Sequence, residues 1–193
     1  MVSDEIITQK LSMLAAQGCC RTVLAFMRLQ FKYGLRISDM LKIQRYDISA
    51  GLRLCVRQSK GSESLILDLS YDMDFWSEYR MGMHTDISLF NRFYFYRLYK
   101  RLGLQELSGG GVNYSVTHSA RRSVVQDVYA VSGSIDAAAA AVGHKSTLST
   151  EHYLSPDQRK RNMGKGILDQ PIADVSHIRV RKNLYSTIIY LKK

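Results

Sequence analysis

The sequence has little proline and no long apolar stretch. Only 2 prolines occur among 193 residues while 46% of the residues are hydrophobic, so a proline-rich disordered chain is excluded. No apolar run approaches the roughly 18 residues that indicate a membrane-spanning helix. The first ten residues carry acidic groups where a secretory signal has basic ones. We therefore expect an ordered globular protein in the cytoplasm, with no membrane partner.

Cysteine is also scarce, and its number is odd. Cys19 and Cys20 are adjacent in a segment that we expect to be helical, and Cys55 lies in an expected strand. This arrangement matches neither a disulfide framework nor a zinc site, which indicates a reducing compartment. The sequence also lacks a carboxylate cluster and a phosphate-binding glycine loop. We therefore expect no metal and no other cofactor.

Acidic residues are outnumbered, with 17 Asp and Glu against 27 Lys and Arg, a formal net charge of +10. Such a balance bears on partners rather than on the fold, and nucleic acid is the leading polyanion. Residues 157–193 alone carry a net charge of +6. A solubilising tail is the alternative interpretation of that segment.

The length favours one domain. We expect residues 1–163 to form it and residues 164–193 to form a tail, because 164–176 contain glycine, proline and polar residues without periodicity. Residues 178–191 alternate apolar and polar side chains, as in a strand or small hairpin. This strand would dock either on the sheet of its own chain or on that of a neighbouring protomer.

The remaining pattern is mainly helical with one β-hairpin. Apolar residues at helical spacing predict helices at 4–17, 20–33, 71–80 and 88–102, and the second ends at Gly34. Leu52, Leu54 and Val56, then Leu65, Leu67 and Leu69, alternate with more polar residues around a turn at Lys60. The helix expected at 88–102 is rich in aromatic residues, which we expect to be part of the core beneath a basic outer face. These residues are Phe90, Phe93, Tyr94, Tyr96 and Tyr99.

The stretch from Val116 to Leu154 holds four residues suited to phosphate chemistry. Thr117 is a plausible N-cap, so His118 and Arg121 project from one side of a helix start. Gly143 ends a later helix and lets His144 turn back toward the same place. Tyr153 follows nine residues after His144. Each residue has an ordinary structural interpretation when taken alone, so the signal lies in their combination.

The ordered set of motifs resembles the catalytic domain of the tyrosine recombinases, the phage-integrase family. GLRISDML, with Arg36, is similar to the first arginine box, and SKGSES, with Lys60, to the hairpin lysine. HSAR supplies His118 and Arg121, while VGH and HYL supply His144 and the nucleophile Tyr153. The resemblance implies an α+β fold: a mainly helical catalytic domain with a small antiparallel sheet.

The resemblance also implies a chemistry and partners. Tyr153 would attack a DNA phosphodiester and form a 3′-phosphotyrosine, with Arg36, Arg121 and His144 binding the phosphate. Lys60 would protonate the leaving 5′-hydroxyl, and His118 would accept the tyrosine proton. The partners would be double-stranded DNA, further protomers forming a tetramer on paired sites, and accessory DNA-bending proteins. Nucleoid association follows from the same role.

Two departures from the family pattern stand out. Ala120 and Arg122 replace a leucine and a histidine of the usual second box, so local packing must differ. Only 35 residues precede Arg36, whereas family members typically carry an N-terminal DNA-binding domain. The chain is therefore either part of a longer protein or a short member with the catalytic domain alone. Two other functions remain open: a type IB topoisomerase, and a DNA-binding accessory protein that does not cut.

Overall fold

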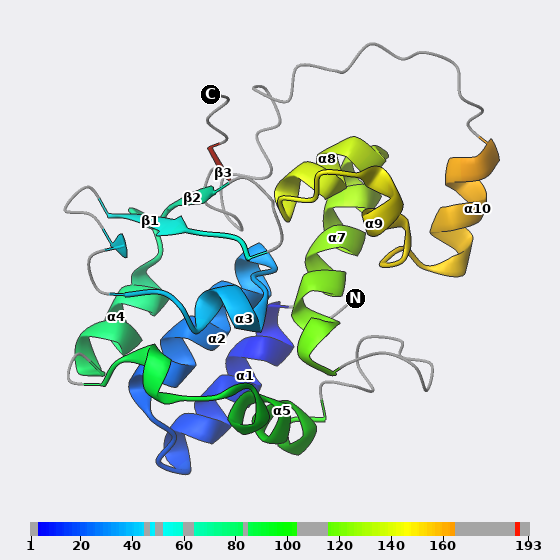
Figure 1. Ribbon diagram of the computed structural model, residues 1–193. Coiled ribbons are helices and arrows are strands. Elements are labelled where there is room, and N and C mark those ends of the chain that lie inside the picture. The colour runs from blue at the N-terminus through cyan, green and yellow to red at the C-terminus, as the bar shows by residue number, and fades with distance from the viewer. Residues whose placement is uncertain are drawn as a thin grey trace.

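The computed structural model describes residues 4–44, 47–48, 52–59, 64–82, 85–103, 116–164 and 188–189. In chain order its α-helices (α), 3-10 helices (η) and strands (β) are α1 (Asp4–Ala16), α2 (Arg21–Tyr33), α3 (Ile37–Met40), β1 (Arg53–Val56), β2 (Leu65–Asp68), α4 (Met73–Met81), η2 (Ile87–Leu89), α5 (Arg92–Arg101), η3 (Val116–His118), α7 (Ser119–Ser132), α8 (Ile135–Ala141), α9 (Thr147–Glu151), α10 (Pro156–Gly164) and β3 (Ile188–Ile189). The expected α+β class is confirmed, with one small antiparallel sheet at the edge of a mainly helical body (Figure 1).

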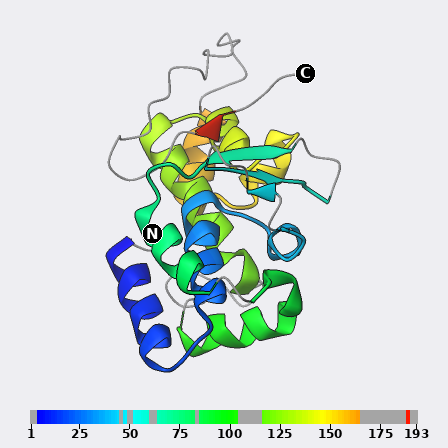
Figure 2. The same cartoon turned by 90° about the vertical axis from the view of Figure 1, so that its left-hand side faces the viewer.

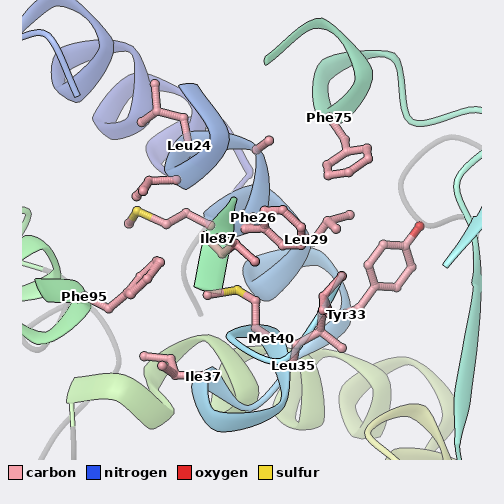
Figure 3. Close-up of a cluster of buried hydrophobic side chains, with 14 of the residues drawn as sticks. Leu24, Phe26, Leu29, Tyr33, Leu35, Ile37, Met40, Phe75, Ile87 and Phe95 are labelled. Atoms are coloured by element: carbon pink, nitrogen blue, oxygen red, sulfur yellow. The ribbon is translucent and has the colours of Figure 1, made fainter. Parts of the chain in front are cut away.

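Helix α2 lies at the centre of the larger of two hydrophobic cores. Its residues from Val23 to Met27 are all buried, so every face of the helix contacts another element. Helices α1, α4 and α5 and the inner face of the sheet surround it, as Figure 3 shows for Leu24, Phe26, Phe75 and Phe95. A helical stretch that is apolar on all sides, as from Val23 to Met27, needs this enclosure to be stable in water.

A smaller core joins α7, α8 and the segment after α9. It contains Val125, Tyr129, Val142 and Leu154. The alanines of α8 are small enough to let this helix approach α7 closely, and Ala138 is fully buried. Figures 1 and 2 show α7, α8 and α9 as one group beside the helices of the larger core.

The two cores meet where α2 ends. Gly34 adopts a left-handed conformation with φ of 64°, as its place after α2 predicts. A Cβ atom on Gly34 would lie 3.0 Å from Val142 Cγ1 and 3.3 Å from Val124 Cβ. Only glycine accommodates both the backbone conformation and this close approach.

The predicted hairpin is present, and it gains a third strand. Strands β1 and β2 pair antiparallel, with Leu54 opposite Leu67 and Val56 opposite Leu65. Strand β3 then pairs antiparallel with β2, placing Ile189 opposite Ile66 and Ile188 opposite Leu67. The apolar segment near the C-terminus therefore contributes an edge strand to the sheet of its own chain, while residues 165–187 lie outside the described residues.

Several element boundaries differ from the sequence-based expectations. The helix expected at 71–80 begins at Met73, after Asp72 rather than Ser70. The one expected at 88–102 divides into η2 and α5, because the Asn91 side chain accepts a hydrogen bond from the Tyr94 backbone N–H and caps α5. The expected core role of Phe93 and Tyr96 is wrong. Phe93 is 76% exposed and Tyr96 is also exposed, because α5 packs only through the face that carries Phe95, Leu98 and Tyr99.

Candidate active site

Arg36 is held at the start of α3 by its apolar neighbours. The backbone N–H of Gly34 donates to the Gln30 carbonyl, and the Gln30 side chain donates to the Leu35 carbonyl at 3.1 Å. Leu35 and Ile37 are buried on either side of Arg36. The arginine side chain is only 17% exposed and points into the protein rather than into solvent.

A carboxylate and an amide fix the guanidinium of Arg36. Its Nη1 donates to Oε1 of Gln58 at 2.5 Å and lies 3.6 Å from Oδ2 of Asp39. Asp39 is 2% exposed, and its Oδ1 accepts hydrogen bonds from the backbone N–H and the hydroxyl of Ser59. Asp39 therefore links the segment that follows strand β1 to Arg36. Lys60, the next residue, lies outside the described residues.

His118 and Arg121 come from the start of α7, although not through the expected cap. A 3-10 turn, η3, precedes the helix, so His118 rather than Thr117 occupies the N-cap position. Arg121 is 3% exposed, and all three nitrogens of its guanidinium donate hydrogen bonds. Nη1 donates to the Gly34 carbonyl at 2.8 Å, and Nη2 donates to the Val142 carbonyl at 2.5 Å. Arg121 thus links the two cores.

The turn after α8 brings His144 to Arg121. Gly143 has φ of 65° and ends the helix, and the His144 N–H donates to the Ala139 carbonyl at 2.9 Å. Nε2 of His144 accepts from Nε of Arg121 at 3.3 Å, which leaves Nδ1 to donate to the Thr150 hydroxyl at 2.8 Å. Thr150 is fully buried, so it orients the ring.

Tyr153 lies beside both histidines. It follows α9, its backbone N–H donates to the Thr150 carbonyl, and its own carbonyl accepts from Gln126 at 3.0 Å. Its hydroxyl oxygen lies 2.9 Å from Nδ1 of His118. The tyrosine ring centroid is 5.6 Å from that of His144. The phenol therefore faces the same point as the arginines.

The crowding of positive charge shifts the ionisation of these groups. Burial, then Arg121 and other arginines, lowers the pKa of His118 below 6.5. The same causes lower the pKa of His144 to about 3. Burial and Arg36 lower the pKa of Arg121 to about 10, although Tyr153 and Asp39 oppose this shift. Both imidazoles are therefore neutral at pH 7, and an anion among them would relieve the repulsion between the arginines.

Five of the six residues singled out in the sequence thus meet at one place, namely Arg36, His118, Arg121, His144 and Tyr153. Sequence reasoning missed Asp39, Gln58 and Thr150. A signal existed for Gln58, because it continues the alternation of Leu54 and Val56 toward the inner face of the sheet. Asp39 lies one helical turn after Arg36, which was a weaker signal.

The described residues contain no group of three or more His, Cys, Asp or Glu side chains placed to hold a metal ion. All three cysteines are free thiols in the structure. Among the described helices, none is both long and apolar enough to cross a membrane.

Comparison with known proteins gives matches in structure but not in sequence. No protein-family model matches the chain, and no curated protein matches its sequence. The XerH site-specific recombinase bound to palindromic difH substrate, in a post-cleavage complex, superposes with a TM-score of 0.58 at 15% identity, over 84% of this chain and 51% of that one. The pre-cleavage complex of XerH with difH gives a TM-score of 0.56 at 14% identity, over 86% of this chain and 52% of that one. The XerA recombinase gives a TM-score of 0.55 at 18% identity, over 87% of this chain and 65% of that one.

The chain therefore spans between about half and two thirds of the recombinases that it matches. More than four fifths of this chain takes part in each superposition. At this level of identity the comparison concerns the fold. The chain has the fold of the catalytic domain of the tyrosine recombinases.

Proposed function

We propose that this protein is a site-specific DNA recombinase or integrase that cuts and rejoins strands through a 3′-phosphotyrosine intermediate. The observation that carries the proposal is the 2.9 Å contact between the Tyr153 hydroxyl and Nδ1 of His118, next to two inward-facing arginines. A phenol beside a neutral imidazole and two guanidinium groups suits nucleophilic attack on a phosphodiester.

In the proposed reaction Tyr153 Oη forms a bond to the scissile phosphorus, and the bond from phosphorus to the 5′-oxygen breaks. His118, which its lowered pKa keeps neutral at pH 7, accepts the phenol proton on Nδ1 in the tautomer that carries its proton on Nε2. Arg36 and Arg121 stabilise the charge on the non-bridging oxygens. Lys60 donates a proton to the departing 5′-oxygen. Religation runs the same steps in reverse, so no nucleotide or metal is consumed.

Phosphate binding requires Arg121 and His144 to change partners. In the DNA-free protein Arg121 donates to the Gly34 and Val142 carbonyls and to Nε2 of His144. His144 becomes a phosphate donor only when Nε2 gains a proton. A bound phosphodiester anion favours that proton, because opposite charge raises the pKa of an imidazole. We therefore expect DNA binding to be accompanied by proton uptake at His144.

The proposed partner is double-stranded DNA, which the formal charge of +10 favours. Helix α5 presents the exposed Arg92, Arg97, Lys100 and Arg101 and contains no acidic residue. Strand exchange further implies a tetramer on paired sites, aided by accessory DNA-bending proteins. Such a protein would act in the cytoplasm, in association with the nucleoid.

The decisive experiment uses a nicked suicide substrate that traps a covalent protein–DNA adduct. We expect an adduct that peptide mapping assigns to Tyr153, in EDTA as well as in magnesium. The Tyr153→Phe variant should bind DNA with unchanged affinity and form no adduct. Dependence on magnesium would contradict the metal-free mechanism, and an adduct with the Phe variant would assign the nucleophile elsewhere.

The same assay separates the proposal from its two alternatives. Exchange of strands between two linear duplexes identifies a recombinase. Relaxation of a supercoiled circle without exchange identifies a topoisomerase. DNA binding with no adduct under any condition identifies an accessory protein that does not cut, and overturns the proposal.

A further inference from the structure

We propose that Gln58 is a positioning residue that holds Arg36 ready for the phosphate through an uncharged contact, an inference that rests on the proposed function. The carbonyl oxygen Oε1 of Gln58 accepts a hydrogen bond from Nη1 of Arg36 at 2.5 Å. Of the contacts described for that guanidinium, this is the shortest.

The position of Gln58 is set by the strand that carries it. Leu54 and Val56 are buried, and alternation along the chain places the Gln58 side chain on the same inner side. The following residue, Ser59, is fixed by two hydrogen bonds to Asp39. The backbone on both sides of Gln58 is therefore restrained, so its amide reaches Arg36 without ordering a free loop.

The far side of the amide rests on the turn that carries His144. A Cβ atom on Gly143 would collide with Nε2 of Gln58 and lie 3.1 Å from its Cδ. Gly143 thus leaves space for the glutamine amide, in addition to adopting φ of 65°. Gln58 fills the gap between Arg36, from the larger core, and the turn of the smaller core.

The chemistry of an amide suits this position. A carboxylate at 2.5 Å would neutralise the guanidinium and compete with phosphate, whereas an amide oxygen fixes the direction of Nη1 and leaves the positive charge available. The carboxylate of Asp39 lies farther away and is shared with the two donors of Ser59. Gln58 therefore orients Arg36 while the charge remains available to bind the phosphate.

The test compares single-turnover cleavage of the suicide substrate by Gln58→Met and Gln58→Glu. Methionine keeps the length and removes the hydrogen bond, so we expect cleavage to slow by about tenfold or more, with the DNA Kd within about threefold. Glutamate keeps the oxygen and adds a charge, so we expect a larger loss of rate. Gln17→Met, at an exposed position after α1, is the matched control and should cleave at the rate of the unaltered protein.

A double-mutant cycle tests whether Gln58 acts through Arg36. In an Arg36→Ala background, Gln58→Met should change the rate by less than about threefold, because the group that it positions is absent. A methylphosphonate at the scissile position, which removes a negative oxygen, should likewise shrink the Gln58→Met defect. An equal defect in both backgrounds, or full activity of Gln58→Met, overturns the inference. So does a parallel loss of Tm and DNA binding, which would indicate a structural role only.

A readout without cleavage separates this inference from the proposed function. Inorganic phosphate is titrated while the Arg36 Nε–H signal is followed by NMR. We expect Gln58→Met to weaken phosphate binding at Arg36 at least threefold, even if the protein proves not to cut DNA. Unchanged phosphate binding at Arg36 overturns the role of Gln58, whatever the outcome of the cleavage assay for the unaltered chain.

Discussion

The hydroxyl oxygen of Tyr153 lies 2.9 Å from Nδ1 of His118, although 35 positions separate the two residues in sequence. The contact joins the start of α7 to the segment after α9, and Gln126 of α7 holds the Tyr153 carbonyl as well. An imidazole and a phenol are thus brought together within one protomer.

His118→Gln should slow cleavage by roughly 100-fold, because a glutamine accepts a hydrogen bond but does not take a proton from the phenol. His152→Gln, exposed and adjacent to Tyr153, should leave the rate unchanged. The lowered pKa of His118 sets the pH profile. In kcat/KM, which reports the free enzyme, activity should be constant near pH 7 and fall only below pH 6.5. An inflection above pH 7 would contradict the assignment of His118.

Lysine at either arginine should cost more than about tenfold in rate, or roughly 1.4 kcal/mol of barrier. The two variants should differ in stability. Arg121→Lys removes donors to the Gly34 and Val142 carbonyls inside the protein and should lower the free energy of unfolding by about 2–4 kcal/mol. Arg36→Lys should unfold nearly as the unaltered protein does. Arg80→Lys, on the exposed side of α4, is the control for both measurements.

The DNA-free protein should lose stability as the pH falls through the acid range. Folded His144 titrates at about pH 3, against 6.5 for the ordinary group, so between these values the unfolded chain binds more protons. The contribution is complete above about pH 6.5 and is lost toward pH 3, with a slope of up to about 1.4 kcal/mol per pH unit. Denaturant unfolding at several pH values measures it. His144→Gln should flatten the curve, and an unchanged curve would show that His144 is not held neutral by the fold.

We propose that the strand near the C-terminus also serves assembly. Within one chain β3 pairs with β2 at Ile66 and Leu67, and exchange of β3 between protomers would fill the same edge of a neighbour's sheet. A chain ending at Gly166 should keep its fold and bind DNA weakly, yet lose oligomerisation and strand exchange, measured by light scattering and a recombination assay. If the shortened protein still recombines paired sites, the tail has no such role. If it unfolds, the strand belongs to its own core.

Local patterns predicted the parts of the site that depend on local chemistry. Gly34 predicted the end of α2, and the spacing of His118 and Arg121 predicted that both project from the start of one helix. Contacts between the segment after β1 and α3 depend on tertiary packing, and no local sequence pattern predicts them. The contacts of Asp39 and Gln58 were therefore found only in the structure. The exposure of Phe93 was missed for a similar reason. Helix α5 carries aromatic residues on all of its sides, and the elements that pack against it determine which of them are buried.

The bond from Arg121 to the Gly34 carbonyl has a consequence for the protein during its synthesis. The strand-cutting chemistry proposed here needs groups from both cores, and the last of them, Tyr153, is translated 117 residues after Arg36. A nascent chain that has formed only the larger core lacks Tyr153 and Arg121. Under the proposed mechanism such a chain would not cut DNA, because the required groups come together only after the smaller core has folded.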